Sequence, residues 1–89
     1  MAILMTSDVS GQTAEGYDGM LTKVGPALRL AKGLILHTAH PVDGGWRIME
    51  IWETREDATR FFATAIAPHL PKGLHPKLSF TPLHDMLQP

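Results

Sequence analysis

The 89-residue chain has no cysteine and no asparagine, and it has a single tyrosine. Without cysteine there can be no disulfide, no thiolate-held zinc or iron–sulfur site and no cysteine nucleophile. The 8 basic residues are scattered and nearly balanced by 9 acidic ones, so no binding surface for nucleic acid or an anionic membrane is predicted. No apolar run approaches the roughly 18 residues of a membrane span, and the first residues, MAILMTSD, lack the basic segment of a signal peptide. A cytoplasmic protein without membrane contact is expected.

The length indicates one domain, taken as residues 1–89. A hydrophobic fraction of 44% with 19% charged residues is typical of a globular protein. A chain this short buries only a modest core, and pairing with a second copy would ease that shortage.

Apolar spacing and turn residues predict six elements in the order β-α-β-β-α-β. Strands are expected over 2–6, 34–40, 46–53 and 77–87, with a loop over 7–12 and helices over 13–30 and 54–68. Gly25-Pro26 predicts a kink or break in the first helix, Thr54 is the expected N-cap of the second, and Pro82 suggests an edge strand or a bulge.

This order predicts an α+β fold of the ferredoxin-like type, with a four-stranded antiparallel sheet and both helices on one face. The other face would be left bare, although its strands carry apolar side chains that are costly to expose. A homodimer formed through the sheets is the expected solution.

The Asp43-Gly44 turn predicts a hairpin that places His37 opposite Glu50 and Ile35 opposite Trp52. One face of this hairpin then gathers His37, Trp46, Glu50 and Trp52. A His37–Glu50 hydrogen bond would satisfy a carboxylate between two tryptophans and make the imidazole a general base. The pair is equally interpreted as structural, and the tryptophans as core packing in place of a pocket wall.

The remaining histidines lack the spacing of metal ligands; they are His40, His69, His75 and His84. Glycines form no phosphate-binding loop and serines form no nucleophile elbow. No metal site is expected.

The segment Ile51-Trp52-Glu53-Thr54, followed by an acidic helix start and Phe61, resembles the small antibiotic-biosynthesis-monooxygenase-like proteins of the dimeric α+β barrel superfamily. The resemblance covers nearly the whole chain. It implies that Trp52 points into a cavity between sheet and helices. The family's cofactor-independent quinone-forming monooxygenases use an asparagine near this tryptophan, and its haem-degrading branch uses asparagine, tryptophan and histidine. Here the asparagine has no counterpart, and His69 is a loose counterpart of the histidine.

The resulting hypothesis is a monooxygenase-like enzyme, without metal, haem or another cofactor, that acts on an aromatic or polycyclic apolar small molecule. The candidate catalytic residues are His37, Glu50 and Trp52. The candidate substrate-binding residues are Tyr17, Trp46, Phe61 and Phe62. The alternatives are a non-catalytic ligand-binding or accessory dimer, and an isomerase or cyclase that uses the same pocket.

Overall fold

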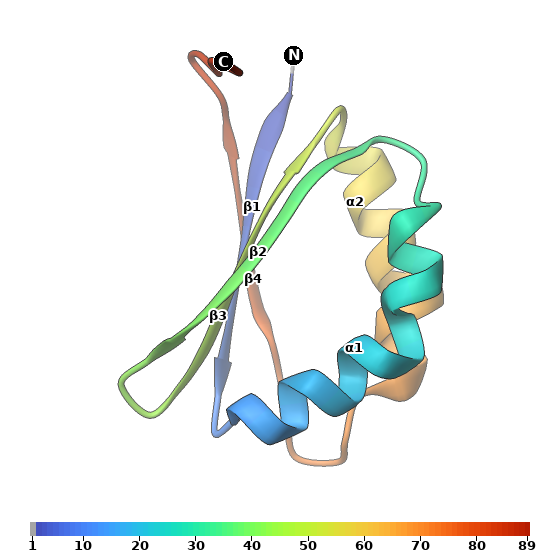
Figure 1. The fold of residues 1–89 in the computed structure, drawn as a ribbon, viewed down its shortest axis with the longest axis vertical. Coiled ribbons are helices and arrows are strands. Elements are labelled where there is room, and N and C mark those ends of the chain that lie inside the picture. The colour runs from blue at the N-terminus through green and yellow to red at the C-terminus, as the bar shows by residue number, and fades with distance from the viewer. Residues whose placement is uncertain (1) are drawn as a thin grey trace.

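The computed structural model describes residues 2–89 as a four-stranded antiparallel sheet in the order β2-β3-β1-β4. Both helices lie on the same side of the sheet (Figure 1). The elements are β1 (Ile3–Ser10), α1 (Ala14–Arg29), β2 (Leu34–Val42), β3 (Gly45–Trp52), α2 (Arg55–Phe61) and β4 (Lys77–Pro82). The predicted ferredoxin-like α+β fold is confirmed.

Strand β1 is longer than the sequence predicted, because Ser7–Ser10 continues the strand and does not form a loop. The apolar run in the sequence ends at Met5. Alternate residues nevertheless stay buried beyond it, because Met5, Ser7 and Val9 all lie buried on one face of the strand. Serine is small enough to face the interior in a strand, and the prediction relied on apolar residues alone. At the other end, β4 stops at Pro82 and does not reach residue 87. Pro82 is the last residue of this edge strand. A proline is tolerated there because it has no N–H to donate to a neighbouring strand.

Helix α1 begins at its predicted N-cap, Thr13, whose hydroxyl accepts a hydrogen bond from the backbone N–H of Gly16 at 3.0 Å. Pro26 lies inside the helix and does not end it. The ribbon of α1 bends along its course (Figure 1). The break that was the alternative at Gly25-Pro26 therefore does not occur, and the helix continues to Arg29.

The β2–β3 hairpin has the predicted register from its turn to His37, which pairs with Glu50. Beyond that point a bulge lies between Leu34 and Leu36, so Trp52 pairs with Leu34 and not with Ile35. The expected Ile35–Trp52 pair is wrong because a bulge adds one residue to one strand, and no turn residue in the sequence marks it.

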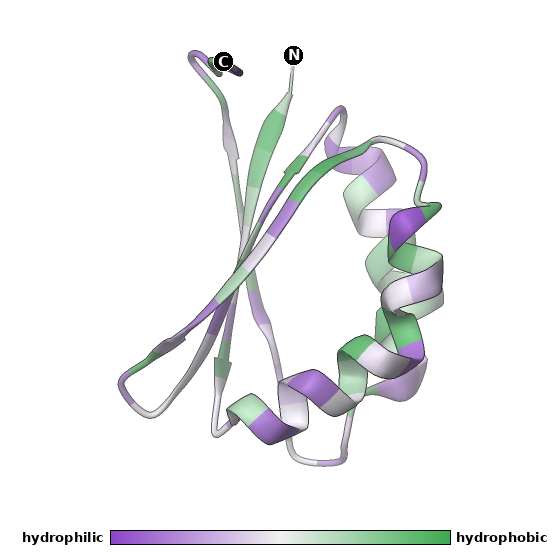
Figure 2. Ribbon diagram, viewed as in Figure 1, coloured by the Kyte–Doolittle hydropathy of each residue, from purple (hydrophilic) through white to green (hydrophobic). Residues whose placement is uncertain are grey.

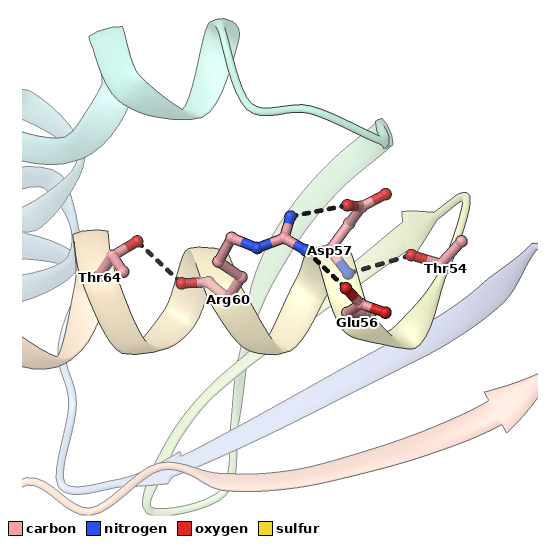
Figure 3. Close-up of polar contacts among 5 residues, drawn as sticks. All are labelled: Thr54, Glu56, Asp57, Arg60 and Thr64. Atoms are coloured by element: carbon pink, nitrogen blue, oxygen red, sulfur yellow. Dashed lines mark hydrogen bonds and ion pairs between the residues drawn. The ribbon is translucent and has the colours of Figure 1, made fainter.

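Helix α2 starts at the predicted cap: the hydroxyl of Thr54 accepts from the backbone N–H of Asp57 at 3.0 Å. Arg60 donates to Asp57 and Glu56, and Thr64 donates to the carbonyl of Arg60 (Figure 3). The expected single helix is divided, since α2 gives way to a π-helical turn over Phe62–Ile66 and a 3-10 turn over Ala67–His69.

The core is centred on Trp52, which is 1% exposed and packs with Met5 and Ala58. Its ring lies 5.6 Å from that of Phe61 between centroids. Trp52 therefore packs β3 against α2, the helix that follows it in the chain.

The face of the sheet opposite the helices has no covering element in residues 2–89, and apolar segments run along the strands (Figure 2). By strand alternation this face carries Leu4, Leu36, Met49 and Ile51, and Leu36 is 50% exposed. None of the helices formed by residues 2–89 has both the length and the apolar character needed to cross a membrane.

Candidate functional site

A cavity of about 80 Å³ lies between the inner face of the sheet and the helices. Its wall is mostly apolar. Four residues with polar side-chain groups interrupt it: Ser7, Tyr17, His37 and Glu50. An apolar cavity with a few convergent polar groups is the usual form of a small-molecule site.

Three of these residues, with Trp52, form a continuous chain of hydrogen bonds across three elements. The hydroxyl of Tyr17 lies 2.7 Å from Nε2 of His37, and Nδ1 of His37 lies 2.6 Å from Oε2 of Glu50. The indole N–H of Trp52 donates to Oε1 of Glu50 at 2.9 Å. Helix α1 supplies Tyr17, β2 supplies His37, and β3 supplies the last two.

The direction of the chain follows from which groups can donate. Trp52 can only donate, and an ionised carboxylate can only accept. Glu50 is 7% exposed, and the two donors that face its oxygens satisfy the buried charge. We therefore assign the proton of neutral His37 to Nδ1, which leaves Nε2 to accept from the hydroxyl of Tyr17.

Tyr17 is held in the first turn of α1 by the Thr13 cap, and its backbone N–H donates to the carbonyl of Thr13 at 2.9 Å. Its ring stacks on His37, at 6.2 Å between centroids, and on Trp46, at 5.5 Å. Burial, and then the negative charges of Glu50 and Asp18, raise the pKa of the Tyr17 hydroxyl above its ordinary 10.0. The phenol is thus held in its neutral, donating form.

The predicted site residues take different places around the cavity. Five of them line it: Tyr17, His37, Glu50, Phe61 and Phe62. The two tryptophans are not among its lining residues. Trp52 lies in the core behind Glu50, whereas Trp46 stacks on Tyr17. In residues 2–89 the indole N–H of Trp46 is the buried side-chain polar group without a hydrogen-bond partner.

The sequence did not reveal two features of the site. The bond from Tyr17 to His37 joins residues 20 positions apart, and no local pattern predicts it. Ser7 also lines the cavity, and the alternation of Met5, Ser7 and Val9 was the available signal for its inward direction.

An open groove of about 650 Å³ lies beside the cavity, along the second half of α1. Leu21, Leu28 and His37 line both spaces. Arg29 and Pro26 add to the wall of the groove. His37 therefore stands between the apolar cavity and the neighbouring groove.

The other histidines lie away from this site. His40, His69, His75 and His84 are all exposed, and none lines the cavity. His69, the loose counterpart of a haem-branch histidine, ends the 3-10 turn. Within the described part of the chain, no three His, Asp or Glu side chains are grouped so as to hold a metal ion.

Comparison with solved structures shows the same fold in SnoaB, a cofactor-independent oxygenase from Streptomyces nogalater. A single-residue mutant of SnoaB matches with a TM-score of 0.70 and 12% identity, over 97% of this chain and 96% of that one. A second SnoaB structure matches with a TM-score of 0.68 and 10% identity over the same shares. This chain therefore shares the ferredoxin-like α+β fold of SnoaB. The resemblance proposed from the sequence is confirmed at the level of the fold.

No protein-family model matches the sequence, and no curated protein matches it. At 10–12% identity the likeness to SnoaB concerns the fold, and a fold alone does not fix a reaction.

Proposed function

We propose that the protein is a monooxygenase-like enzyme, without metal or organic cofactor, that acts on an aromatic small molecule bearing an acidic hydroxyl. The observation that carries the proposal is the Tyr17–His37–Glu50 chain at the wall of an otherwise apolar cavity. A buried carboxylate behind an imidazole orients the ring and stabilises its protonated form, as a proton-accepting group requires.

The chemistry needs only a base and dioxygen. Removal of the hydroxyl proton makes the aromatic ring electron-rich. With an anthrone-type substrate, the ring methylene then becomes a carbonyl: the substrate gives up four electrons to dioxygen, one oxygen atom enters the product, and the other leaves as water. The protein's part is to bind the rings, hold the proton and exclude bulk solvent.

The apolar wall supports an aromatic ligand, since Phe61 and Phe62 are among the residues that line it and aromatic rings pack favourably on one another. The cavity between the sheet and the helices, at about 80 Å³, is well below the roughly 300 Å³ of small ligand sites. The neighbouring groove is large enough, and it shares Leu21, Leu28 and His37 with the cavity. We propose that the substrate enters from the groove as these two leucines part.

The fold of SnoaB supports oxygenase chemistry by analogy. The absence of asparagine distinguishes this chain from the quinone-forming monooxygenases that it resembles. The proposal therefore assigns the polar role at the cavity to the chain of Tyr17, His37 and Glu50.

Oxygen uptake with an anthrone-type substrate tests the function. The wild type should consume one dioxygen per quinone formed, and labelled dioxygen should place one labelled atom in the product. The matched pair of variants is His37→Ala, which removes the base, and His40→Ala, which removes an exposed histidine from the same strand. We expect the first to lose turnover and the second to keep it.

Two results would favour the alternatives. Saturable binding of aromatic compounds without turnover would indicate a ligand-binding protein. Conversion of a substrate with no oxygen uptake would indicate an isomerase or cyclase.

We also propose that the uncovered sheet face, with Leu4, Leu36, Met49 and Ile51, pairs with the same face of a second copy. A symmetric pairing would cover the apolar side chains of both subunits at once. Light scattering should give about twice the mass of 9.8 kDa. Leu36→Lys should shift the mass toward the monomer, whereas Leu30→Lys, at a residue 87% exposed on the helical side, should leave the dimer intact. A monomeric wild type at micromolar concentration contradicts this pairing.

A further inference from the structure

We infer that Tyr17 is the residue that meets the substrate hydroxyl, and that the proton passes through Tyr17 to His37. The inference rests on the proposed function and changes its mechanism: His37 accepts the proton without touching the substrate. It starts from the occupation of both imidazole nitrogens, Nδ1 by Glu50 at 2.6 Å and Nε2 by Tyr17 at 2.7 Å.

A histidine with both nitrogens engaged has no free lone pair to offer to a ligand in the cavity. Either Tyr17 leaves when the substrate binds, or it stays and relays the proton. Its surroundings favour staying. The phenol ring is stacked on Trp46 and His37, and its backbone lies in a turn fixed by the Thr13 cap.

The transfer is balanced within this chain. The substrate O–H bond breaks and its proton bonds to the oxygen of Tyr17, while the Tyr17 O–H bond breaks and its proton bonds to Nε2 of His37. Tyrosine is a phenol before and after the step, and no electron is transferred. The products are a substrate anion and an imidazolium paired with the Glu50 carboxylate.

The final arrangement stabilises the anion. The protonated Nε2 of His37 donates to the oxygen of Tyr17, and the hydroxyl of Tyr17 then donates to the substrate oxygen. A donor aimed at developing charge inside an apolar cavity stabilises that charge more than a donor in water does. The raised pKa of Tyr17, caused by burial and by the charges of Glu50 and Asp18, disfavours a free phenolate and fits a concerted transfer.

The test uses 4-nitrophenol, whose absorption moves to longer wavelength on ionisation, and it does not depend on oxygen chemistry. The intact protein should bind the probe and shift its ionisation to lower pH than in buffer. Tyr17→Phe keeps the ring and removes the hydroxyl. It should bind the probe but lower the bound nitrophenolate fraction at pH 6 on the order of tenfold, equivalent to about one pKa unit.

Asp18→Asn is the matched control, because Asp18 is exposed and contributes only its charge to the surroundings of Tyr17. It should leave the ionised fraction within about twofold of wild type. Thermal unfolding of each variant verifies the fold.

Because the chain has one tyrosine, 3-fluorotyrosine can replace Tyr17 alone during biosynthesis. Its more acidic hydroxyl should shift the ionisation of the probe to still lower pH.

The outcomes separate this inference from the proposed function. If Tyr17→Phe ionises the probe as the wild type does, or if the wild type does not ionise it, the relay is overturned. Oxygen uptake in the wild type would then still uphold the function. If the probe is ionised through Tyr17 but no substrate consumes oxygen, the relay stands and the oxygenase function falls.

Discussion

Nδ1 of His37 lies 2.6 Å from Oε2 of Glu50, on neighbouring strands whose register pairs the two residues directly. The side chain of Glu50 is 8% exposed and that of His37 is 19% exposed. A charge-assisted hydrogen bond this short and this sheltered fixes both side chains. Any change of one partner therefore acts on the orientation of the other.

Glu50→Gln should lower turnover by ~10² to 10⁴-fold and lower the free energy of unfolding by about 1–3 kcal/mol. The amide presents an NH2 group where one carboxylate oxygen stood, so Nδ1 of His37 can no longer donate there while Trp52 keeps its acceptor, and the charge that stabilises the imidazolium is lost. Oxygen-uptake kinetics and urea unfolding measure the two effects. The control is Glu53→Gln, at an exposed residue just after the same strand. Equal activity in the two variants would make the His37–Glu50 pair purely structural.

The two tryptophans should respond differently to phenylalanine. Trp52→Phe removes a donor to the buried Glu50 carboxylate, whereas Trp46→Phe removes a buried N–H that has no partner in residues 2–89. Both changes remove the same volume, but Trp52 is fully buried and Trp46 only partly, so lost packing and the lost hydrogen bond both add to the cost at Trp52. We expect Trp52→Phe to be about 1–3 kcal/mol less stable than Trp46→Phe by chemical denaturation. The opposite order would contradict a stabilising role for the hydrogen bond from Trp52 to Glu50.

Much of this site follows from local rules of sequence. The Asp43-Gly44 turn fixes the register of the hairpin, and the register places His37 opposite Glu50. The Thr54 cap sets the start of α2, from which Phe61 reaches Trp52 and the cavity. These predictions succeed because each depends on residues near one another in the chain.

The features that the sequence did not predict depend on tertiary contacts. The bulge between Leu34 and Leu36 changes the partner of Trp52, and Ile35 within it is neither a glycine nor a turn residue. The bond from Tyr17 to His37 requires the angle at which α1 crosses the sheet. The sequence made Tyr17 a candidate substrate-binding residue, but it could not place the Tyr17 hydroxyl within 2.7 Å of an imidazole nitrogen.

Gly33→Ala should be strongly destabilising, and Gly73→Ala provides the matched control. Both glycines have positive φ, +86° and +94°, which costs other residues about 1–2 kcal/mol. A Cβ at Gly33 would also collide with the carboxylate of Asp57, while a Cβ at Gly73 would meet nothing within 4 Å. Thermal unfolding should show the larger loss at Gly33. Equal losses would indicate that Asp57 can move aside freely.

Asp57 should contribute to stability at neutral pH and lose that contribution in acid. Burial would raise the pKa of its carboxyl, but hydrogen bonds with Thr54 and Arg60 and the charges of Lys32 and Arg60 outweigh it and lower the pKa below 3.8. A lowered folded-state pKa stabilises the fold above the unfolded value, and the contribution disappears as pH falls through the folded value. Urea midpoints measured from pH 6 to pH 2 should fall more steeply in wild type than in Asp57→Asn, with the difference lying below about pH 4. Parallel curves would contradict this assignment.

Tyr17 should give the opposite dependence at alkaline pH. Its raised folded-state pKa, caused by burial and by the charges of Glu50 and Asp18, means that the folded protein holds the phenolic proton more tightly than the unfolded chain does. The resulting stability is fully present below the unfolded value near 10.0 and is lost as pH rises through the folded value.

Because Tyr17 is the single tyrosine, the ultraviolet absorption of tyrosinate follows its ionisation directly. Its midpoint should lie above 10.0 in wild type and move down in Glu50→Gln, which removes one of the charges. Tyr17→Phe should lack this part of the alkaline loss of stability. A midpoint of tyrosinate formation at or below 10.0 in wild type would show that the hydroxyl is not held as the geometry indicates.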